Sequence, residues 1–454
     1  MLAQAHDPKA PGMDTWLDEA RHRGEISPQD AALAREIAYG VCRHRRRLEK
    51  AVDRYLERPL SRGAWLVYET LLIGAYQAIY LERVPSHSIV DESVRLVASA
   101  RTEATYRGLV NAIMRRIVEE YRESGSPPGE DAGNWLMRHS VPDWLASEGG
   151  QIYRNSANER FFEASNEPAP LQLRVTQQAE GLSLEELEER LRGEIVDVTH
   201  SVPEIERGRF LKDCFTIRGR GIAPEYLPSF RKGLLTAEDE GGQIAGWLTG
   251  AAPGMKILDL CASPGGKAAH MMDLTRREAR IVACDVSEQK LQRLRETLQR
   301  VGSVHRCELA MAEEMTAERY AEVFDLALVD APCSGLGTLR RHPEIRWRRS
   351  TRDLRALARQ QSDLLEQAAP LVAVGGTLVY TLCTFTVAET DDVVTRFLDS
   401  HREFRLTGPP EGLPFDEKAF RVGDGRWRTA PHLHGCDGFF IARFRKNSPT
   451  VPTP

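Results

Sequence analysis

Two cysteines in the second half of the chain each stand at the end of an apolar run. Cys333 lies in ALVDAPCSGLG and Cys383 lies in TLVYTLCTFT. Both runs are typical of buried parallel strands, and small, polar or turn-forming residues follow each cysteine. Ligands bind in the crevice at the carboxyl ends of the strands in an open α/β sheet, so we expect both thiols to face one site. Thiols beside the carboxylate of Asp330 suit nucleophilic and proton-transfer chemistry.

A Gly-rich turn, DLCASPGGK from Asp259 to Lys267, joins an apolar strand to a helix. Paired glycines let a backbone approach a ligand closely, and the following helix N-terminus offers unpaired amides. Asp285 ends the next strand, where a carboxylate can accept hydrogen bonds from a ribose diol. The sequence has no G-x-x-x-x-G-K-[ST] phosphate loop and no complete G-x-G-x-x-G. A nucleotide-like ligand without a phosphate cradle therefore fits best, and a purely structural turn is the alternative.

The composition is that of an ordinary globular protein. The 454 residues allow two or three domains, with 41% hydrophobic and 28% charged residues. No run approaches the roughly 18 apolar residues of a membrane span, and the first residues lack a signal pattern, so we expect a cytoplasmic protein. Eight cysteines without framework spacing indicate free thiols. The net charge of −5 argues against a uniformly cationic nucleic-acid binder, but it does not exclude local basic stripes.

The N-terminal part of the chain is predicted to be helical throughout. Apolar residues recur at a spacing of three to four in residues 31–57 and 65–82. Further helices are expected at 86–101 and 106–121. We therefore predict an all-α domain over residues 1–125, followed by a Ser-, Pro- and Gly-rich linker.

The rest of the chain is predicted to contain two more regions and a tail. Residues 126–235 combine the linker with a small mixed α/β region, with short strands around 171–176 and 214–219. From residue 236 to 447 strands alternate with helices, which implies right-handed βαβ units on a parallel sheet. The tail, 448–454, is expected to be disordered.

These motifs in combination resemble the bacterial ribosomal RNA cytosine-5 methyltransferases of the RsmB (Sun/Fmu) type. The resemblance lies in DLCASPGGK, in VDAPCSG with RRHPEIRW after it, and in LVYTLCT. Three N-terminal segments resemble the NusB-like RNA-binding domain of these enzymes: AREIAYGVCRHRRRLE, LLIGAYQAIYLERVPSHSIVDESV and GLVNAIMRRI. The resemblance extends from about Trp16 to Lys446. It implies a multidomain protein, with an all-α NusB-like domain, a small mixed α+β region and an α/β Rossmann-like methyltransferase domain that depends on S-adenosylmethionine.

The resemblance implies methylation of a cytosine in small-subunit (16S) ribosomal RNA. Carbon 5 of cytosine is a poor nucleophile, so a thiolate first adds to carbon 6 and creates an enamine that can attack a methyl sulfonium. By the motifs of the family, Cys383 is the nucleophile and Cys333 helps to release the product. Asp330 would hydrogen-bond the base edge and favour the protonated adduct. The target base must leave any stack, which favours an RNA loop or an unfolded stretch.

The same resemblance implies that S-adenosylmethionine lies along the Gly-rich turn. The residues implied in cofactor binding are Cys261, Ala262, Ser263, Pro264, Gly265, Gly266, Lys267, Asp285 and Asp330. The acidic residue that contacts adenine in the family would fall near Met311 or Ala312. The chain offers only Glu313 and Glu314 nearby, so no residue is assigned to that role.

An enzyme that acts on RNA needs a cationic track, and two arginine clusters are candidates. Residues 340–359 contain eight arginines and only two acidic residues, and Trp347 offers a stacking face among them. A second cluster spans residues 43–47. A charge run is usually a solvated face, but the resemblance favours RNA contacts. The predicted contacts are Arg340, Arg341, Arg346, Trp347, Arg348, Arg45 and Arg46.

His432, His434 and Cys436 alternate as metal ligands on one face of a strand would. No fourth ligand follows at zinc-site spacing, and the family resemblance indicates a structural hairpin, so we predict no metal. We also expect a monomer. Two alternatives remain open: the same chemistry on transfer RNA, or a non-catalytic NusB-like RNA-binding or antitermination protein. The presence of both cysteines argues against the non-catalytic protein, since RNA binding alone needs no thiols. The sequence does not separate the two RNA substrates, because a shared fold and catalytic site do not encode the target.

Overall fold

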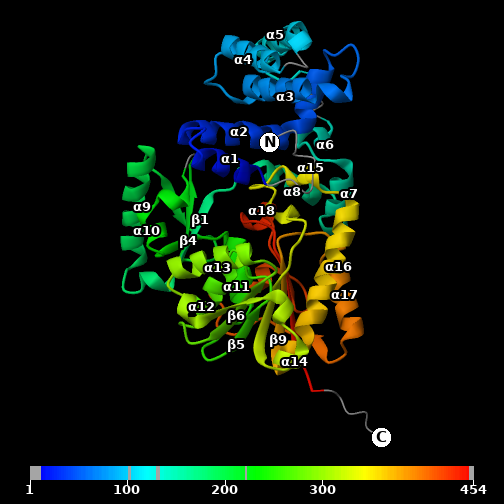
Figure 1. The fold of residues 1–454 in the computed structure, drawn as a ribbon. Helices are drawn as coiled ribbons and strands as arrows, with labels where there is room; N and C mark the ends of the chain where they lie inside the picture. Colours follow the sequence, from blue (N-terminus) through cyan, green and yellow to red (C-terminus); the bar gives the residue numbers. More distant parts are fainter. Residues whose placement is uncertain (1–11, 101–103, 129–132, 220–221, 449–454) are drawn as a thin grey trace. The chain divides into compact units, whose positions relative to one another are not determined.

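The computed structural model describes residues 12–100, 104–128, 133–219 and 222–448. The chain divides into two compact units, drawn as ribbons in Figure 1. The first unit comprises Met1–Glu167 and Leu339–Ser350, and the second comprises Pro168–Thr338 and Thr351–Pro454. The tail that was predicted to be disordered falls, from residue 449, outside the described residues.

The first unit is built of helices, as predicted for its N-terminal part. Its elements are α1 (Met13–His22), α2 (Pro28–Asp53), α3 (Trp65–Tyr80), α4 (Ser86–Ser99), α5 (Arg107–Ser124), α6 (Trp135–Arg138), α7 (Asp143–Ile152), α8 (Ser156–Asn166) and α15 (Ile345–Arg348). Ser27 caps α2 by accepting a hydrogen bond from the amide of Asp30, and Gly125 ends α5 in a left-handed conformation. The apolar stripes close on a core that includes Leu71 and Met114.

The boundaries of this unit differ from the predicted domains. Helices α6 to α8 belong to the first unit, whereas the sequence placed them with a linker and a small mixed region. Aromatic side chains hold these three helices together: Trp135 stacks on Phe162, and Tyr153 stacks on Phe161. The segment Leu339–Ser350 also belongs to this unit, although it lies some 170 residues further along the chain.

The second unit contains a small antiparallel sheet of order β2-β3-β1-β4. Its strands are β1 (Leu171–Val175), β2 (Glu204–Arg207), β3 (Cys214–Arg218) and β4 (Leu235–Ala237), with α9 (Leu184–Thr199) and α10 (Pro228–Arg231) beside them. α9 begins with a capping box between Ser183 and Glu186, and its buried face packs on the sheet through Leu187 and Leu191. The predicted small mixed region is therefore confirmed for this part of the chain.

The large sheet of this unit has nine strands, of order β11-β12-β13-β9-β8-β5-β6-β7, and β10 pairs with β13. Its strands are β5 (Lys256–Asp259), β6 (Arg280–Asp285), β7 (Cys307–Met311), β8 (Phe324–Asp330), β9 (Val372–Leu382), β10 (Phe404–Leu406), β11 (Arg421–Gly423), β12 (Arg426–Arg428) and β13 (Phe440–Lys446). β5 to β9 run parallel, and β13 is antiparallel to β9. The strand order reverses between β5 and β8, which is the switch point where such sheets bind ligands.

Helices cover both faces of this sheet (Figure 1). They are α11 (Glu240–Leu248), α12 (Gly266–Leu274), α13 (Glu288–Arg300), α14 (Ala317–Tyr320), α16 (Thr351–Ala368) and α17 (Asp391–Ser400). Neighbouring residues of one strand serve opposite faces: Ile257 packs in the cluster of α11, α12 and α13, whereas Leu258 packs in that of α16 and α17. The predicted α/β architecture is confirmed.

The stretch around His432 departs from the predicted strand. Residues Pro431–His434 form a short helix, α18, between β12 and β13. Pro431 stands at its first position, where a missing amide costs nothing, and Gly435 ends it with a φ of +78°. His434 Nδ1 accepts a hydrogen bond of 2.9 Å from the amide of Ala430. His434 therefore ties the end of the short helix to the residue that precedes it.

Candidate active site

The two thiols meet because β8 and β9 are parallel neighbours. Asp330, the last residue of β8, pairs with Thr381 near the end of β9. Cys333 lies three residues after β8 and Cys383 directly after β9, and their sulfur atoms are 3.2 Å apart. The hydrogen bond with Cys383, together with burial, raises the pKa of Cys333 well above its usual range. Either sulfur can donate in this contact, and Cys333 is a thiol that holds its proton firmly.

Asp330 and Lys267 form an ion pair beside the thiols. Lys267 Nζ is 2.7 Å from Asp330 Oδ2, and the hydroxyl of Thr381 donates to Asp330 Oδ1 at 2.8 Å. Burial is the largest single influence and lowers the pKa of Lys267, but the charge and hydrogen bond of Asp330 and the charge of Glu238 together outweigh it and leave this pKa raised. The Lys267 ammonium also lies 5.0 Å from the ring centre of Phe439. The lysine is therefore a fixed cation that, with Thr381, holds the carboxylate of Asp330 in place.

Asp285, at the end of β6, holds the Gly-rich turn in place. The carboxylate of Asp285 accepts hydrogen bonds from the amides of Ser263, at 3.1 Å, and Val286, at 2.8 Å, and pairs with Lys290 at 2.9 Å. Gly265 adopts a φ of +111°, and a Cβ there would lie 3.0 Å from a methyl group of Leu294. The turn therefore presents backbone, and little side chain, at the ends of β5 and β6.

Asp259 has a fully buried carboxyl group, and such a group is costly to bury without a hydrogen-bond donor or a cation beside it. No donor in the described part of the chain makes a hydrogen bond of normal geometry to either of its oxygens. Burial, and then the negative charge of Asp330, raises its pKa to about 8. The carboxylates of Asp259, Asp285 and Asp330 stand at the ends of three adjacent strands. Carboxylate oxygens accept hydrogen bonds and attract cations, so these three residues suit a ligand with cationic and hydroxyl groups.

Sequence reasoning missed two contributors to this site. Asp259 was recognised as part of the Gly-rich motif but was given no role. Lys267 was expected along the cofactor turn, whereas it reaches Asp330 beside the thiols. The signal for Asp259 was its place as the last residue of an apolar strand. The pairing of Lys267 with Asp330 has no signal in the sequence, because 62 residues separate the two.

Several of the arginines predicted to contact RNA are buried inside the first unit. Arg346 has no exposed surface, and one of its nitrogens, Nη1, donates to the backbone carbonyl of His139 at 3.2 Å. Trp347 donates from its indole to the carbonyl of Cys42 at 2.7 Å and packs on the core of the unit. Arg45 pairs with Glu69 at 2.6 Å and is 4% exposed.

These positions correct the predicted RNA contacts of Arg346 and Arg45, whereas the contact of the half-buried Trp347 remains a proposal. A guanidinium that is enclosed by protein cannot reach phosphate in this conformation. Arg340 is likewise buried, and its carbonyl accepts a hydrogen bond of 2.9 Å from Arg43. Arg341 and Arg348 are half-buried, and their RNA contacts remain a proposal.

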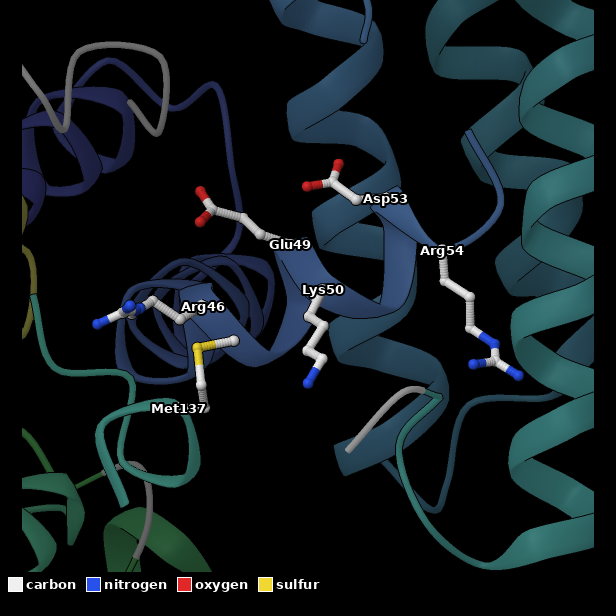
Figure 2. A pocket seen from close by; sticks show the side chains of 6 residues that line it. All are labelled: Arg46, Glu49, Lys50, Asp53, Arg54 and Met137. Atoms are coloured by element: carbon white, nitrogen blue, oxygen red, sulfur yellow. The ribbon is translucent and has the colours of Figure 1, made fainter. Parts of the chain in front are cut away.

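Arg46 lines a pocket of about 450 Å³ on the first unit (Figure 2). The pocket residues are Arg46, Glu49, Lys50, Asp53, Arg54 and Met137. Arg46, Lys50 and Arg54 recur every four residues, so they follow one stripe along α2 and its end. Arg46 also donates to Asp143 at 3.0 Å and to the carbonyl of Val141.

Substitutions in the segment Leu339–Ser350 separate a structural role from RNA binding. Trp347→Ala should lower the free energy of unfolding by about 2–3 kcal/mol, because it removes packing and an indole hydrogen bond. Burial, with the nearby charge of Arg43, lowers the pKa of Arg346 to about 9. Arg346→Met, which has a similar length, should change the free energy of unfolding by no more than about 1 kcal/mol. Chemical denaturation measures both values.

The same Arg346→Met variant tests RNA binding directly. We expect its RNA affinity, and the slope of that affinity with salt concentration, to equal those of the unaltered protein, since the guanidinium is enclosed. A weaker affinity with a shallower salt slope would return Arg346 to the RNA surface.

Two parts of the chain match known protein families. Residues 248–445 match the family described as 16S rRNA methyltransferase RsmB/F, and residues 2–119 match the NusB family. The chain is 30% identical to the probable ribosomal RNA small subunit methyltransferase B of Bacillus subtilis, over 93% of this chain and 92% of that protein. It is 31% identical to the ribosomal RNA small subunit methyltransferase B of Pasteurella multocida, over 96% and 92%. The crystal structure of PH0851 shares the fold, with a TM-score of 0.74 and 24% identity over 91% of this chain and 90% of that one.

Proposed function

This chain belongs to the RsmB/F family of 16S rRNA methyltransferases, and we propose that it methylates carbon 5 of a cytosine in small-subunit ribosomal RNA through a covalent cysteine adduct. Membership confirms the family resemblance recognised in the sequence. The observation that carries the finer proposal is the pair of thiols 3.2 Å apart at the ends of β8 and β9, beside an ion pair.

The reaction requires one thiol to add to carbon 6 of the base. By its resemblance to the family motif LVYTLCT, Cys383 is the nucleophile in this proposal, and the sulfur of Cys333 lies 3.2 Å from it. Addition to carbon 6 makes carbon 5 electron-rich, and carbon 5 then accepts the methyl group. S-adenosylmethionine, the methyl donor of this family, supplies that group on a positively charged sulfur.

Release of the product requires a base and a leaving group. The proton on carbon 5 must be removed, and the sulfur of Cys383 must leave carbon 6 with the bonding electrons. We assign the proton removal to Cys333. The hydrogen bond with Cys383 is the largest cause of its raised pKa, and that cause disappears once Cys383 is bonded to the base. Cys333 therefore becomes easier to deprotonate at the step that needs a base.

Asp330 is proposed to accept a hydrogen bond from the protonated edge of the base. Its two fixed donors, Lys267 and Thr381, hold the carboxylate in place before the base arrives.

The cofactor fits the neighbouring carboxylates. The turn from Cys261 to Lys267 would contact it through backbone, with Asp285 on the ribose, and a cationic group beside Asp259 would favour the charged form of that carboxyl.

RNA binding is proposed to involve the helical unit, whose N-terminal part matches the NusB family. Arg46 with Lys50 and Arg54 is the basic stripe that we assign to phosphate contacts. No helix in the described residues is long and apolar enough to span a membrane. A ribosomal RNA target would place the protein in the cytoplasm, and we propose that it acts there as a monomer without a metal ion.

Mapping of 5-methylcytosine in total RNA from cells that lack the gene tests this function. We expect one position in the small-subunit ribosomal RNA to lose its methyl group. A plasmid with the unaltered gene should restore the group, whereas one with Cys383→Ser should not. Loss of a transfer RNA site instead would establish transfer RNA as the substrate. An unchanged map would favour the non-catalytic alternative.

A further inference from the structure

Glu389 is a fully buried carboxylate in the turn between β9 and α17. Its Oε1 accepts hydrogen bonds from the amide of Ser334, at 2.8 Å, and from the side chain of Gln361, at 3.1 Å. Its Oε2 accepts from the hydroxyls of Thr386, at 2.8 Å, and Thr384, at 3.3 Å. A buried carboxylate with four donors is well satisfied without a counter-ion.

The donors of Glu389 come from both cysteine loops. Ser334 follows Cys333 directly, and Thr384 follows Cys383 directly. The hydroxyls of Ser334 and Thr384 are also 2.8 Å apart, so the two loops are joined side to side. The amide of Gly337 also donates to the carbonyl of Cys383 at 2.9 Å. Charge-assisted hydrogen bonds are roughly twice as strong as neutral ones, so Glu389 is a strong connection between these loops.

Two further contacts fix Glu389 to the scaffold. Its own carbonyl accepts a hydrogen bond of 2.7 Å from the hydroxyl of Tyr380, a buried residue of β9. Gln361, on α16, donates both to Glu389 and to the carbonyl of Pro332 at 2.9 Å, just before Cys333. The carboxylate is therefore anchored to the sheet and to a helix while it holds both loops.

We propose that Glu389 is a positioning residue that clamps the loop of Cys333 to the loop of Cys383 and so sets the distance between the two thiols. This role rests on the proposed function, because the thiol pair matters only if the two sulfurs share the reaction. Without the carboxylate, the amide of Ser334 and the side chain of Gln361 lose their acceptor, and the loops can separate. Its negative charge also helps to keep Cys333 protonated.

Thiol cross-linking measures this distance without RNA, cofactor or activity. Diamide takes up one hydrogen atom from each thiol as the two sulfurs join, and sulfurs 3.2 Å apart need to move only about 1 Å to bond. Mass spectrometry of the linked peptides gives the rate. We expect Glu389→Ala to slow the Cys333–Cys383 cross-link at least about tenfold and Glu389→Gln, which keeps an acceptor oxygen and the volume, no more than about threefold.

The methylation kinetics provide a second readout. Glu389→Ala should reduce kcat by about 100-fold, because a misplacement of about 1 Å at the reacting group costs that much. The KM values for RNA and S-adenosylmethionine should stay within about twofold, and Glu389→Gln should restore most of kcat. A general loss of structure would instead change all of these quantities together.

Glu240→Ala is a matched control. Glu240 is also buried, and its carboxylate accepts the amides of Arg209, Phe210 and Leu211, away from both cysteine loops. Its replacement should destabilise the second unit without slowing the cross-link.

If Glu389→Ala does not fold, Thr384→Val provides a second test of the clamp. It removes one hydroxyl of the clamp at constant volume and should slow the cross-link about threefold.

The outcomes separate the clamp from the reaction. A cross-link as fast in Glu389→Ala as in the unaltered protein, or one slowed equally by Glu240→Ala, would overturn the clamp. If Glu389→Ala does not fold, an unchanged cross-linking rate in Thr384→Val would likewise overturn the clamp. A slowed cross-link in a chain that methylates no RNA would leave the clamp standing and sink the proposed function alone.

Discussion

Replacement of Cys383 by serine is expected to abolish methylation, with a loss of roughly 10⁴-fold or more in kcat, while S-adenosylmethionine still binds. A hydroxyl has nearly the volume of a thiol, but it is far less acidic, and the neighbouring thiol of Cys333 is no base for it. The cofactor turn is attached to β5 and β6, so its contacts should survive the change. Transfer of labelled methyl groups to RNA measures the first effect, and calorimetric titration with the cofactor measures the second.

Cys307→Ser is the control for this experiment. Cys307 is a half-buried thiol in the edge strand β7 of the same sheet. Because it lies in no part of the proposed site, its replacement should leave kcat within about twofold. Appreciable methylation by the Cys383→Ser protein, with normal activity in this control, would remove Cys383 as the nucleophile.

The sequence predicted the elements of the fold because their local patterns are strong. Parallel strands buried on both faces are continuous apolar runs, and β5, β6, β8 and β9 have this character. The helices of the first unit follow from apolar residues at a spacing of three to four. The domain boundaries were less predictable, since α6 to α8 are tied to the rest of the first unit by contacts distant in sequence, such as those of Arg46 with Asp143 and of Arg346 with His139, which a local pattern does not encode.

The site could be predicted in part, for a topological reason. Cys333 and Cys383 meet because adjacent parallel strands deliver their carboxyl ends to one edge, and two apolar runs that both end in cysteine indicate this. The partners of these residues could not be predicted. Lys267 reaches Asp330 from another strand–helix turn, and the hydrogen bonds of Glu389 require two loops and the helix α16 to be in place.

The arginine-rich segment shows why charge counts mislead. Its eight arginines suggested a track for phosphate, yet Arg346 is enclosed and donates to backbone carbonyls. A count of charges does not distinguish a guanidinium that faces solvent from one that is buried and donates to the otherwise unpaired carbonyls at a helix end. A warning was present in the segment, since Ile345 and Trp347 place apolar side chains among the arginines.

Replacement of Cys333 by alanine is expected to trap the enzyme on its RNA. The attack by Cys383 needs no atom of Cys333, although the loss of its hydrogen bond should slow the attack by roughly tenfold. Release depends on removal of the carbon 5 proton, and no other thiol lies within hydrogen-bond distance of Cys383 in the described residues. Multiple turnover should therefore fall by about 10²–10⁴-fold, the usual contribution of a positioned base.

The trapped species is visible on a denaturing gel. RNA with a radioactive end should migrate with the Cys333→Ala protein in near-stoichiometric amount, but with neither the unaltered protein nor the double variant Cys333→Ala, Cys383→Ser. The double variant is the decisive comparison, because it keeps the RNA-binding surface and lacks only the sulfur that forms the bond. Normal turnover by Cys333→Ala would refute the release role. An adduct that persists in the double variant would show that another residue attacks the base, and the two thiols would then owe their 3.2 Å contact to packing alone.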